Sequence, residues 1–285
     1  MTPTLLRSST NSDLDAFIIQ GIKSWTPTSR TELPPKCELI YQGDASKVFS
    51  PAQFPAVVIK WQHDSREEVL CMQYARRHLS SVVSIPRILY CPPFKFSRGR
   101  FAEYSLKGRP WGAWFICMDR CPGVSLDKVI EGMTPSQLDH IALQLKTILL
   151  HMSTCVRPRT LGSVTGGPYC NFFFPNYVAP KHAFTSVGEF NDHIRWMLML
   201  FCTETFTESF LAQFPRNAAK RFAHADLLPR NIMVEEGGST ITGIVDWSTA
   251  GFYPEYWEYA RMHDRDCMTP AWDYVLQRVF PTPRR

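Results

Sequence analysis

The segment from His224 to Asp246 limits the possible folds of this 285-residue chain more than any other feature. Asp226 is followed five residues later by Asn231, and then by two apolar runs, Ile232–Val234 and Ile241–Val245. A Gly-Gly pair separates the two runs, so they predict a β-hairpin. The hairpin would fix the distance between Asn231, which precedes its first strand, and Asp246, which follows its second strand.

An Asp, an Asn five positions later and a second Asp after a hairpin form the arrangement of kinase catalytic and metal-binding loops. Phosphoryl transfer needs positioned metal ions and an oriented nucleophile, and hard oxygen ligands suit Mg²⁺. We therefore interpret Asp226 as the catalytic group that accepts or orients a hydroxyl proton, and Asn231 and Asp246 as Mg²⁺ ligands. His224 is interpreted as a brace of the loop, with titration in the reaction as the alternative. Each residue alone could be an ordinary loop residue; their order favours catalysis.

The segment resembles the aminoglycoside phosphotransferase family, most closely its fungal-type members, whose loop usually reads H-G-D-x-x-x-x-N. The similarity continues through Asp246-Trp247 to Trp257-Glu258, and it spans about residues 37–280. Ala225 stands where the family usually has Gly, and Leu228 where it often has His. Both departures leave the three oxygen-bearing residues in place. We interpret Trp257-Glu258 as stabilising its lobe, with a substrate role for Glu258 as the alternative.

The resemblance implies an α+β, protein-kinase-like fold with two lobes. A small N-terminal lobe would contain an antiparallel β-sheet and one helix, and a larger C-terminal lobe would be mainly helical. We expect an N-terminal helix and Pro-rich connector over residues 1–36, a nucleotide-binding lobe over 37–120, and a catalytic and substrate lobe over 121–285. The resemblance does not account for residues 1–36 or for a basic insertion at Lys95–Arg109.

Local patterns predict the individual elements. Thr134 and Gln137 have capping-box spacing at the start of the strongest helix, and Ser125 is expected to cap a short helix. Other helices are predicted at residues 12–25, 65–79 and 186–211. Strands are predicted at residues 37–41, 56–61, 86–90 and 113–118, with a polar turn at Gly43–Ser46 and a Pro-bounded region at 51–55 between the first two strands.

Lys60 ends an apolar run and is the candidate ligand of the ATP phosphates. By similarity to the family, Glu68 is its better partner, while Glu67 should face solvent. A lone Lys at such a position is more often a surface charge, and only the downstream motif favours the nucleotide role.

Three further positions are assigned to ATP binding with less support from their side chains. Ser46 and nearby backbone amides could contact phosphate, although the loop has a single Gly where kinases use several. The backbone at Met118 and Arg120, in the predicted hinge between lobes, could hydrogen-bond adenine.

Composition excludes several other classes of protein. The net charge of +5 comes from scattered Lys and Arg, which argues against a nucleic-acid partner. No apolar run approaches the ~20 residues that span a membrane, and the first residues lack a signal-peptide pattern. Nine irregularly spaced cysteines are typical of free thiols in a reducing compartment. A cytoplasmic protein is expected; the oligomeric state stays open, with a monomer as the default.

Together these features predict an ATP- and Mg²⁺-dependent phosphotransferase that moves the γ-phosphate to a hydroxyl of a small molecule. A catalytically weak kinase-fold binding or scaffold protein is the alternative, motivated by the Gly-poor loop, Ala225 and Leu228. A protein kinase fits less well because no activation segment follows Asp246. The acceptor stays open: an aminoglycoside would need a carboxylate-lined pocket, to which four acidic residues could contribute if they are not simply on the surface, Glu255, Asp264, Asp266 and Asp273.

Overall fold

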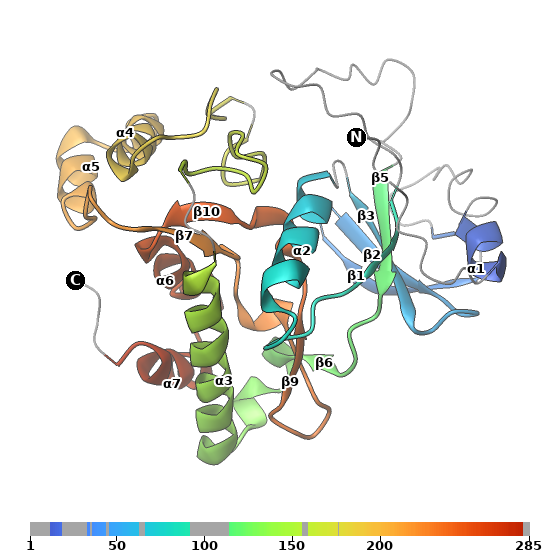
Figure 1. Cartoon of the computed structure of the whole chain (residues 1–285). Helices are drawn as coiled ribbons and strands as arrows, with labels where there is room; N and C mark the ends of the chain where they lie inside the picture. Colours follow the sequence, from blue (N-terminus) through green and yellow to red (C-terminus); the bar gives the residue numbers. More distant parts are fainter. Residues whose placement is uncertain are drawn as a thin grey trace. The chain divides into compact units, whose positions relative to one another are not determined.

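The structure is a computed structural model that describes residues 12–18, 33–34, 36–43, 46–62, 66–91, 114–155, 159–175 and 177–281 (Figure 1). The chain divides into two compact units. The first contains the residues up to Val69 together with Pro86–Arg120, and the second contains Leu70–Ile85 and the chain from Cys121 onward. The predicted insertion at Lys95–Arg109 and most of the Pro-rich connector lie outside the described residues.

A five-stranded antiparallel sheet forms the first unit, in the order β1-β2-β3-β5-β4. The four predicted strands are confirmed, but the region between the first two also holds a strand that the sequence did not predict. It forms because its residues pair with strands on both sides, and because Phe49 within it is completely buried. The strands are β1 (Cys37–Gln42), β2 (Ser46–Pro51), β3 (Val57–Gln62), β4 (Ile88–Tyr90) and β5 (Trp114–Asp119).

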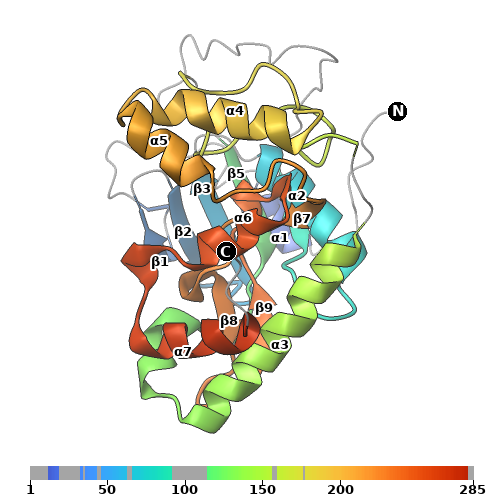
Figure 2. The same ribbon diagram turned by 90° about the vertical axis from the view of Figure 1, so that its left-hand side faces the viewer.

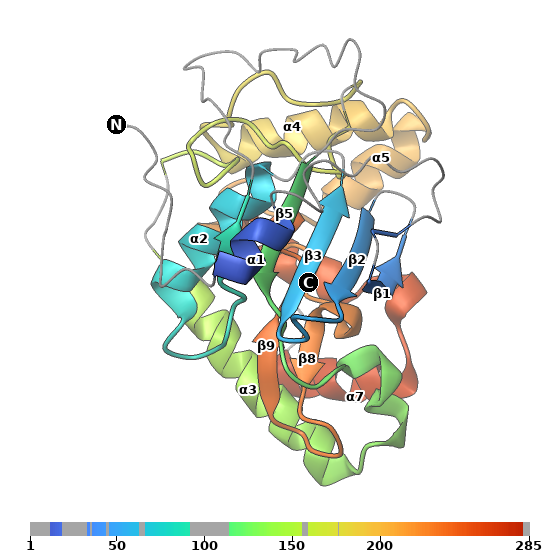
Figure 3. The same cartoon turned by 90° about the vertical axis from the view of Figure 1, so that its right-hand side faces the viewer.

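One face of this sheet is covered by the short helix α1 (Ser12–Ala16), which lies in front of the strands in Figure 3. Ile18, just after α1, packs in a cluster with Ile59 of β3 and Phe115 of β5. Successive side chains of a strand point to opposite faces, so Lys60 lies on the face away from this cluster. The rest of the helix predicted to reach residue 25 lies outside the described residues.

The second unit is built around α3 (Pro135–Thr154), which packs against α7 (Pro270–Val279) (Figure 2). The predicted capping box is confirmed: the Thr134 hydroxyl accepts from the Gln137 amide, and the Gln137 side chain accepts from the Thr134 amide at 2.9 Å. The predicted apolar face is buried as well, through Leu138, Ile141, Leu145, Ile148 and Met152. The predicted helix at 65–79 is α2 (Arg66–Leu79), which begins in the first unit and continues into the second.

The single helix predicted over residues 186–211 is wrong. The segment forms α4 (Val187–Leu198) and α5 (Glu204–Leu211), which appear as consecutive helices in Figure 2. Thr203 breaks the helix because its backbone is extended and its hydroxyl caps α5 by accepting from the Phe206 amide. Arg195 of α4 pairs with Glu204 and Glu208 of α5, which shows that the two helices contact each other after the turn instead of forming one helix.

Short strands complete the second unit. The predicted hairpin is confirmed as β8 (Ile232–Val234) and β9 (Ile241–Ile244), with β6 (Val124–Ser125) pairing on the outer side of β8. A separate pair, β7 (Lys220–Ala223) and β10 (Gly251–Pro254), lies side by side in Figure 1 and was not predicted.

Helical turns and one short helix fill the rest of this unit. Ser125 precedes a 3-10 turn at Leu126–Lys128, but its side chain makes no capping bond, so that part of the prediction is wrong. The helix α6 (Tyr256–Met262) follows β10 directly. Among the described residues, no helix is long and apolar enough to span a bilayer.

Replacing Thr134 by Ala should lower the free energy of unfolding by about 1 kcal/mol, because the helix loses a side chain that satisfies one of its first amides. Chemical denaturation measures the change. Thr147→Ala is the matched control: Thr147 is an exposed residue inside the same helix, and its hydroxyl donates to the Leu143 carbonyl rather than to an amide of the first turn. Equal losses in the two variants would contradict a capping role.

Candidate active site

The loop that carries Asp226 joins two different sheets of the second unit. It starts where β7 ends at Ala223 and finishes where β8 begins at Ile232. The register of the hairpin sets Ile232 opposite Ile244, and the Val245 amide donates to the Asn231 carbonyl at 3.0 Å. Asn231 and Asp246 therefore lie at the same end of the β8–β9 hairpin, as the sequence predicted.

Every backbone group at the start of this loop has a partner. The amides of His224 and Ala225 both donate to Oε2 of Glu258, at 2.5 and 3.1 Å. The His224 carbonyl accepts from the Thr249 hydroxyl at 2.9 Å, and the Ala225 carbonyl accepts from Nε of Arg261 at 3.3 Å. Thr249, just before β10, and two residues of α6 thus bind the backbone of the loop. The loop is buried, so water cannot satisfy these groups.

His224 is completely buried, and its ring connects the loop to the residue that follows β9. Its Nδ1 accepts from the Asp226 amide at 3.3 Å, which assigns the proton to Nε2, and Nε2 donates to the Val245 carbonyl at 3.1 Å. The ring also meets Trp247 edge to face at 4.5 Å between centroids. This arrangement supports the brace interpretation, because both ring nitrogens bond backbone groups, one inside the loop and one directly after β9.

Ala225 adopts a left-handed backbone with φ of 65°. Such a conformation costs a non-Gly residue roughly 1–2 kcal/mol. The Ala225 side chain is fully buried in a cluster that includes Tyr169, Phe190 and Tyr253, which offsets part of that cost. Ala225 therefore adopts the left-handed conformation in place of the family's usual Gly, and its methyl group is packed in the core.

The Asp226 carboxylate is buried and surrounded by donors. Nη2 of Arg230 donates to both of its oxygens at 2.8 and 2.9 Å, and Nδ2 of Asn231 donates to Oδ2 at 2.7 Å. Arg261 places Nη2 at 3.8 Å from Oδ1. Neither arginine was predicted from the sequence. The spacing of Arg230, four residues after Asp226, was the available signal for one of them.

Asn231 and Asp246 offer a donor set that fits Mg²⁺. The amide nitrogen of Asn231 is bound to the Asp226 carbonyl and carboxylate, so its Oδ1 is the end that a metal can take. Asp246 has a left-handed backbone with φ of 60°, and its Oδ1 accepts from the Ser248 hydroxyl at 2.7 Å. An amide oxygen and a carboxylate at one end of a hairpin are the hard ligands that Mg²⁺ prefers.

The candidate nucleotide residues belong to the first unit. Lys60 on β3 and Glu68 at the start of α2 are both buried, with Nζ of Lys60 at 3.0 Å from each Glu68 oxygen. Gln62 also donates to Glu68 at 2.6 Å. The predicted pair is therefore formed, while Glu67 is only partly exposed. The binding of phosphate by Lys60 stays a prediction.

The other three nucleotide positions are placed in the same sheet. Ser46 starts β2, and its carbonyl accepts from the Gly43 amide at 2.9 Å. Met118 lies inside β5, paired with neighbours on both sides. The Arg120 amide donates to the Ala56 carbonyl at 2.8 Å, so this N–H is already used within the sheet. Their roles in ATP binding stay predictions.

Three of the acidic residues considered for an acceptor pocket have other contacts. Asp264 pairs with Arg261 at 3.1 Å and accepts from the Asp266 amide. Asp273, on the exposed side of α7, accepts from Gln277 at 2.7 Å. Glu255 lines a pocket between α3 and α6 together with Glu258. These contacts do not bring a carboxylate cluster to Asp226.

The comparison with protein families decides the relationship of the chain. A model of the phosphotransferase enzyme family (APH) matches residues 52–280. The chain belongs to this family. No curated protein sequence matches the chain significantly.

Solved structures show that this phosphotransferase-family chain shares the fold of aminoglycoside phosphotransferases. A ternary complex of a thermostable mutant of APH(4)-Ia with AMP-PNP and hygromycin B matches with a TM-score of 0.58 at 16% identity, over 87% of this chain and 79% of that one. The GDP complex of aminoglycoside 2'-phosphotransferase-IIIa matches with a TM-score of 0.56 at 15% identity, over 95% and 83%. A streptomycin–ATP complex of APH(2")-IIa matches with a TM-score of 0.55 at 12% identity, over 96% and 82%.

The predicted protein-kinase-like α+β fold is thereby confirmed. At identities of 12–16%, the similarity shows the fold alone and does not identify the acceptor.

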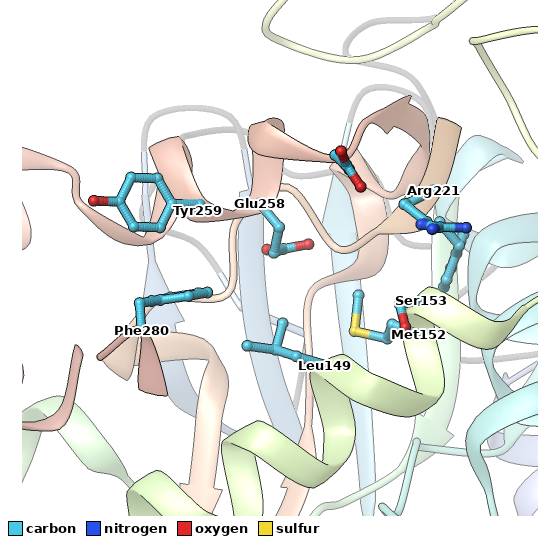
Figure 4. A pocket seen from close by; sticks show the side chains of 9 residues that line it. Leu149, Met152, Ser153, Arg221, Glu258, Tyr259 and Phe280 are labelled. Carbon is cyan, nitrogen blue, oxygen red and sulfur yellow. The ribbon is translucent and has the colours of Figure 1, made fainter. Parts of the chain in front are cut away.

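The carboxyl group that holds the candidate catalytic loop of this phosphotransferase lies at a pocket of about 210 Å³. Figure 4 shows Glu258 extending from α6 toward Leu149 and Met152 of α3. Its Oε1 has no hydrogen-bond partner among the described residues. Burial raises the pKa of Glu258 to about 7, although the amides of Ala225 and His224 favour the charged form.

Protonated Glu258 should stabilise the folded state, and the effect should depend on pH. Since burial raises its pKa from 4.5 to about 7, this stabilisation is fully present below pH ~4.5 and is lost as the pH rises to 7. Glu258→Gln keeps a carbonyl oxygen for both amides and removes the titration. The difference in unfolding free energy between wild type and this variant should therefore move in favour of the variant between pH 4.5 and 8.

Chemical denaturation at several pH values measures this difference, and Glu236→Gln, at an exposed residue of the hairpin turn, is the control. Glu258→Ala leaves two buried amides unpaired and should lose several kcal/mol at every pH. A constant difference between wild type and Glu258→Gln across the range would show that Glu258 does not titrate there.

Proposed function

We propose that this chain transfers the γ-phosphate of ATP to a hydroxyl of a small molecule in a Mg²⁺-dependent reaction, as a fungal-type member of its family. The observation that carries the proposal is the buried Asp226 carboxylate, which is fixed in one loop beside Asn231 and at the end of the hairpin that presents Asp246. Family membership supports phosphoryl transfer as the chemistry.

The chain's own groups can perform the parts of the reaction that a protein must supply. Asp226 would accept the hydroxyl proton as the acceptor oxygen forms its bond to the γ-phosphorus. The bond from phosphorus to the β,γ-bridging oxygen breaks at the same time, and ADP leaves with that electron pair. Mg²⁺, held by Asn231 and Asp246, would neutralise charge on the phosphate oxygens.

Lys60 is proposed to bind the α- and β-phosphates, with Glu68 orienting its ammonium group. Both groups are buried, and a buried ammonium requires a paired anion. Similar structures hold AMP-PNP, ATP or GDP, which supports a nucleoside triphosphate as the donor. We propose ATP, and we assign the nucleotide to residues 37–120 and the catalytic groups to residues 121–285.

Asp226→Asn should reduce acceptor-dependent ADP release by about 10²–10⁴-fold, because the amide cannot take the hydroxyl proton. Stabilisation by AMP-PNP and Mg²⁺ in a thermal-shift assay should survive, since Asp226 is not a proposed nucleotide ligand. The assay needs an acceptor, which a screen of hydroxylated compounds with wild-type protein supplies; GTP is run beside ATP.

Asp273→Asn is the matched control, because Asp273 is an exposed carboxylate on α7 that accepts a hydrogen bond from Gln277 and lies outside the candidate site. It should keep wild-type turnover. Turnover that is unchanged in Asp226→Asn would refute the assignment of the base. Stabilisation by nucleotide without turnover on any acceptor would favour the alternative of a binding or scaffold protein.

A further inference from the structure

Two arginines of the second unit lie beside the candidate base. Arg230 bonds both oxygens of Asp226 through Nη2, and Arg261 approaches Oδ1 at 3.8 Å. The two guanidinium side chains are 45% and 25% exposed, so each can be reached from solvent. A hydroxyl that approaches Asp226 therefore meets two permanent positive charges.

The carboxylates near this pair are already neutralised. The ion pairs of Arg230 and Arg261 among the described residues are with Asp226 and Asp264. Neither carboxylate is left for an ammonium group of an acceptor, and a positive acceptor would meet like charge at both guanidinium groups. This argues against a polycationic acceptor at this site.

The guanidinium groups still have donors for an anion. Each guanidinium carries five N–H groups in a planar fork. Arg230 uses Nη2 on Asp226 and Nη1 on Sγ of Cys267, while Arg261 uses Nε on the Ala225 carbonyl and Nη2 on Asp264. Stacking over Phe173, at 4.6 Å from Cζ to the ring centroid, also fixes the plane of Arg261. Such forks match a carboxylate or phosphate group.

We propose that Arg230 and Arg261 bind an anionic group of the acceptor, so that the substrate is an alcohol that carries a carboxylate or phosphate near its reactive hydroxyl. This inference rests on the proposed function and names the acceptor class for the same site. In this proposal the contact between Arg230 and Asp226 also controls when Asp226 can act as the base. Arg230 leaves Asp226 for the acceptor anion, and the freed Asp226 oxygen receives the hydroxyl proton.

When Arg230 moves to the acceptor anion, the buried Asp226 carboxylate keeps Nδ2 of Asn231 at 2.7 Å and Nη2 of Arg261 at 3.8 Å, so it is not left without partners. A water molecule has no anionic group that could draw Arg230 away from Asp226. With water as the acceptor, Asp226 therefore stays bound to Arg230 and is less available as the base for ATP hydrolysis. The arrangement therefore selects the acceptor by its charge and limits wasteful turnover through the same side chain.

The test uses two matched sets of alcohols that differ in charge: glucuronate, glucose and glucosamine, and glycerate, glycerol and 3-amino-1,2-propanediol. Calorimetry on the full-length protein with ADP and Mg²⁺ measures binding, and ADP release from ATP measures transfer. Within a set, the carboxylate should bind at least ~10-fold more tightly than the amine, the ratio that about 1.4 kcal/mol produces.

Variants separate binding from a purely structural role of the arginines. Arg230→Gln and Arg261→Gln should remove the preference for the carboxylate, whereas Arg230→Lys should retain part of it through its charge. Arg230→Gln should also raise water-driven ATP hydrolysis severalfold, because Arg230 then no longer occupies both oxygens of Asp226. Arg216→Gln, at an exposed residue that pairs with Asp192, is the control and should change neither quantity.

A preference for the amines, affinities independent of charge, or no binding of either carboxylate would overturn the inference. A drop in water-driven hydrolysis in Arg230→Gln would overturn the control of Asp226 by Arg230, since Arg230 would then only position Asp226. If the carboxylates bind in an Arg230-dependent manner but ATP is never turned over, the anion site stands and the proposed transferase function fails. If amines are phosphorylated best, the function stands and this inference fails.

Discussion

Two consecutive amides at the end of β7 share one carboxylate oxygen of Glu258, and the shape of the candidate catalytic loop depends on this contact. The loop is buried, so each of its N–H and C=O groups needs a partner within the protein. Glu258 supplies the amides' acceptor, while Thr249 and Arg261 supply donors for the carbonyls. With its backbone held from these sides, the loop can keep Ala225 in a left-handed conformation and present Asp226.

The α6 helix contacts the candidate catalytic loop through two residues three positions apart. Glu258 fixes the backbone of the loop from one side, and Arg261 reaches the carbonyl of Ala225 and the carboxylate of Asp226. Residues three or four positions apart on a helix lie on one face, so both can contact a single loop. One helical turn therefore contributes both to the rigidity of the candidate base and, together with Arg230, to the charge of its surroundings.

Features encoded by neighbouring residues could be predicted from the sequence. The Thr134 capping box and the hairpin between Asn231 and Asp246 are local patterns, whereas the Lys60–Glu68 pair was expected from the resemblance to the family. The structure contains all three. The break between α4 and α5 was missed because the apolar pattern continues through it and only the cap at Thr203 reveals it. The partners of the loop were missed because they lie far along the chain: 34 residues separate His224 from Glu258.

The separation between His224 and Glu258 also sets an order of events during synthesis. A growing chain contains Asp226, Asn231 and Asp246 before α6 is synthesised. Until then the amides of His224 and Ala225 have no buried acceptor, and the left-handed turn at Ala225 lacks the contacts that hold it. The nascent protein therefore possesses its candidate reactive groups before it can arrange them, and the arrangement waits for the synthesis of α6.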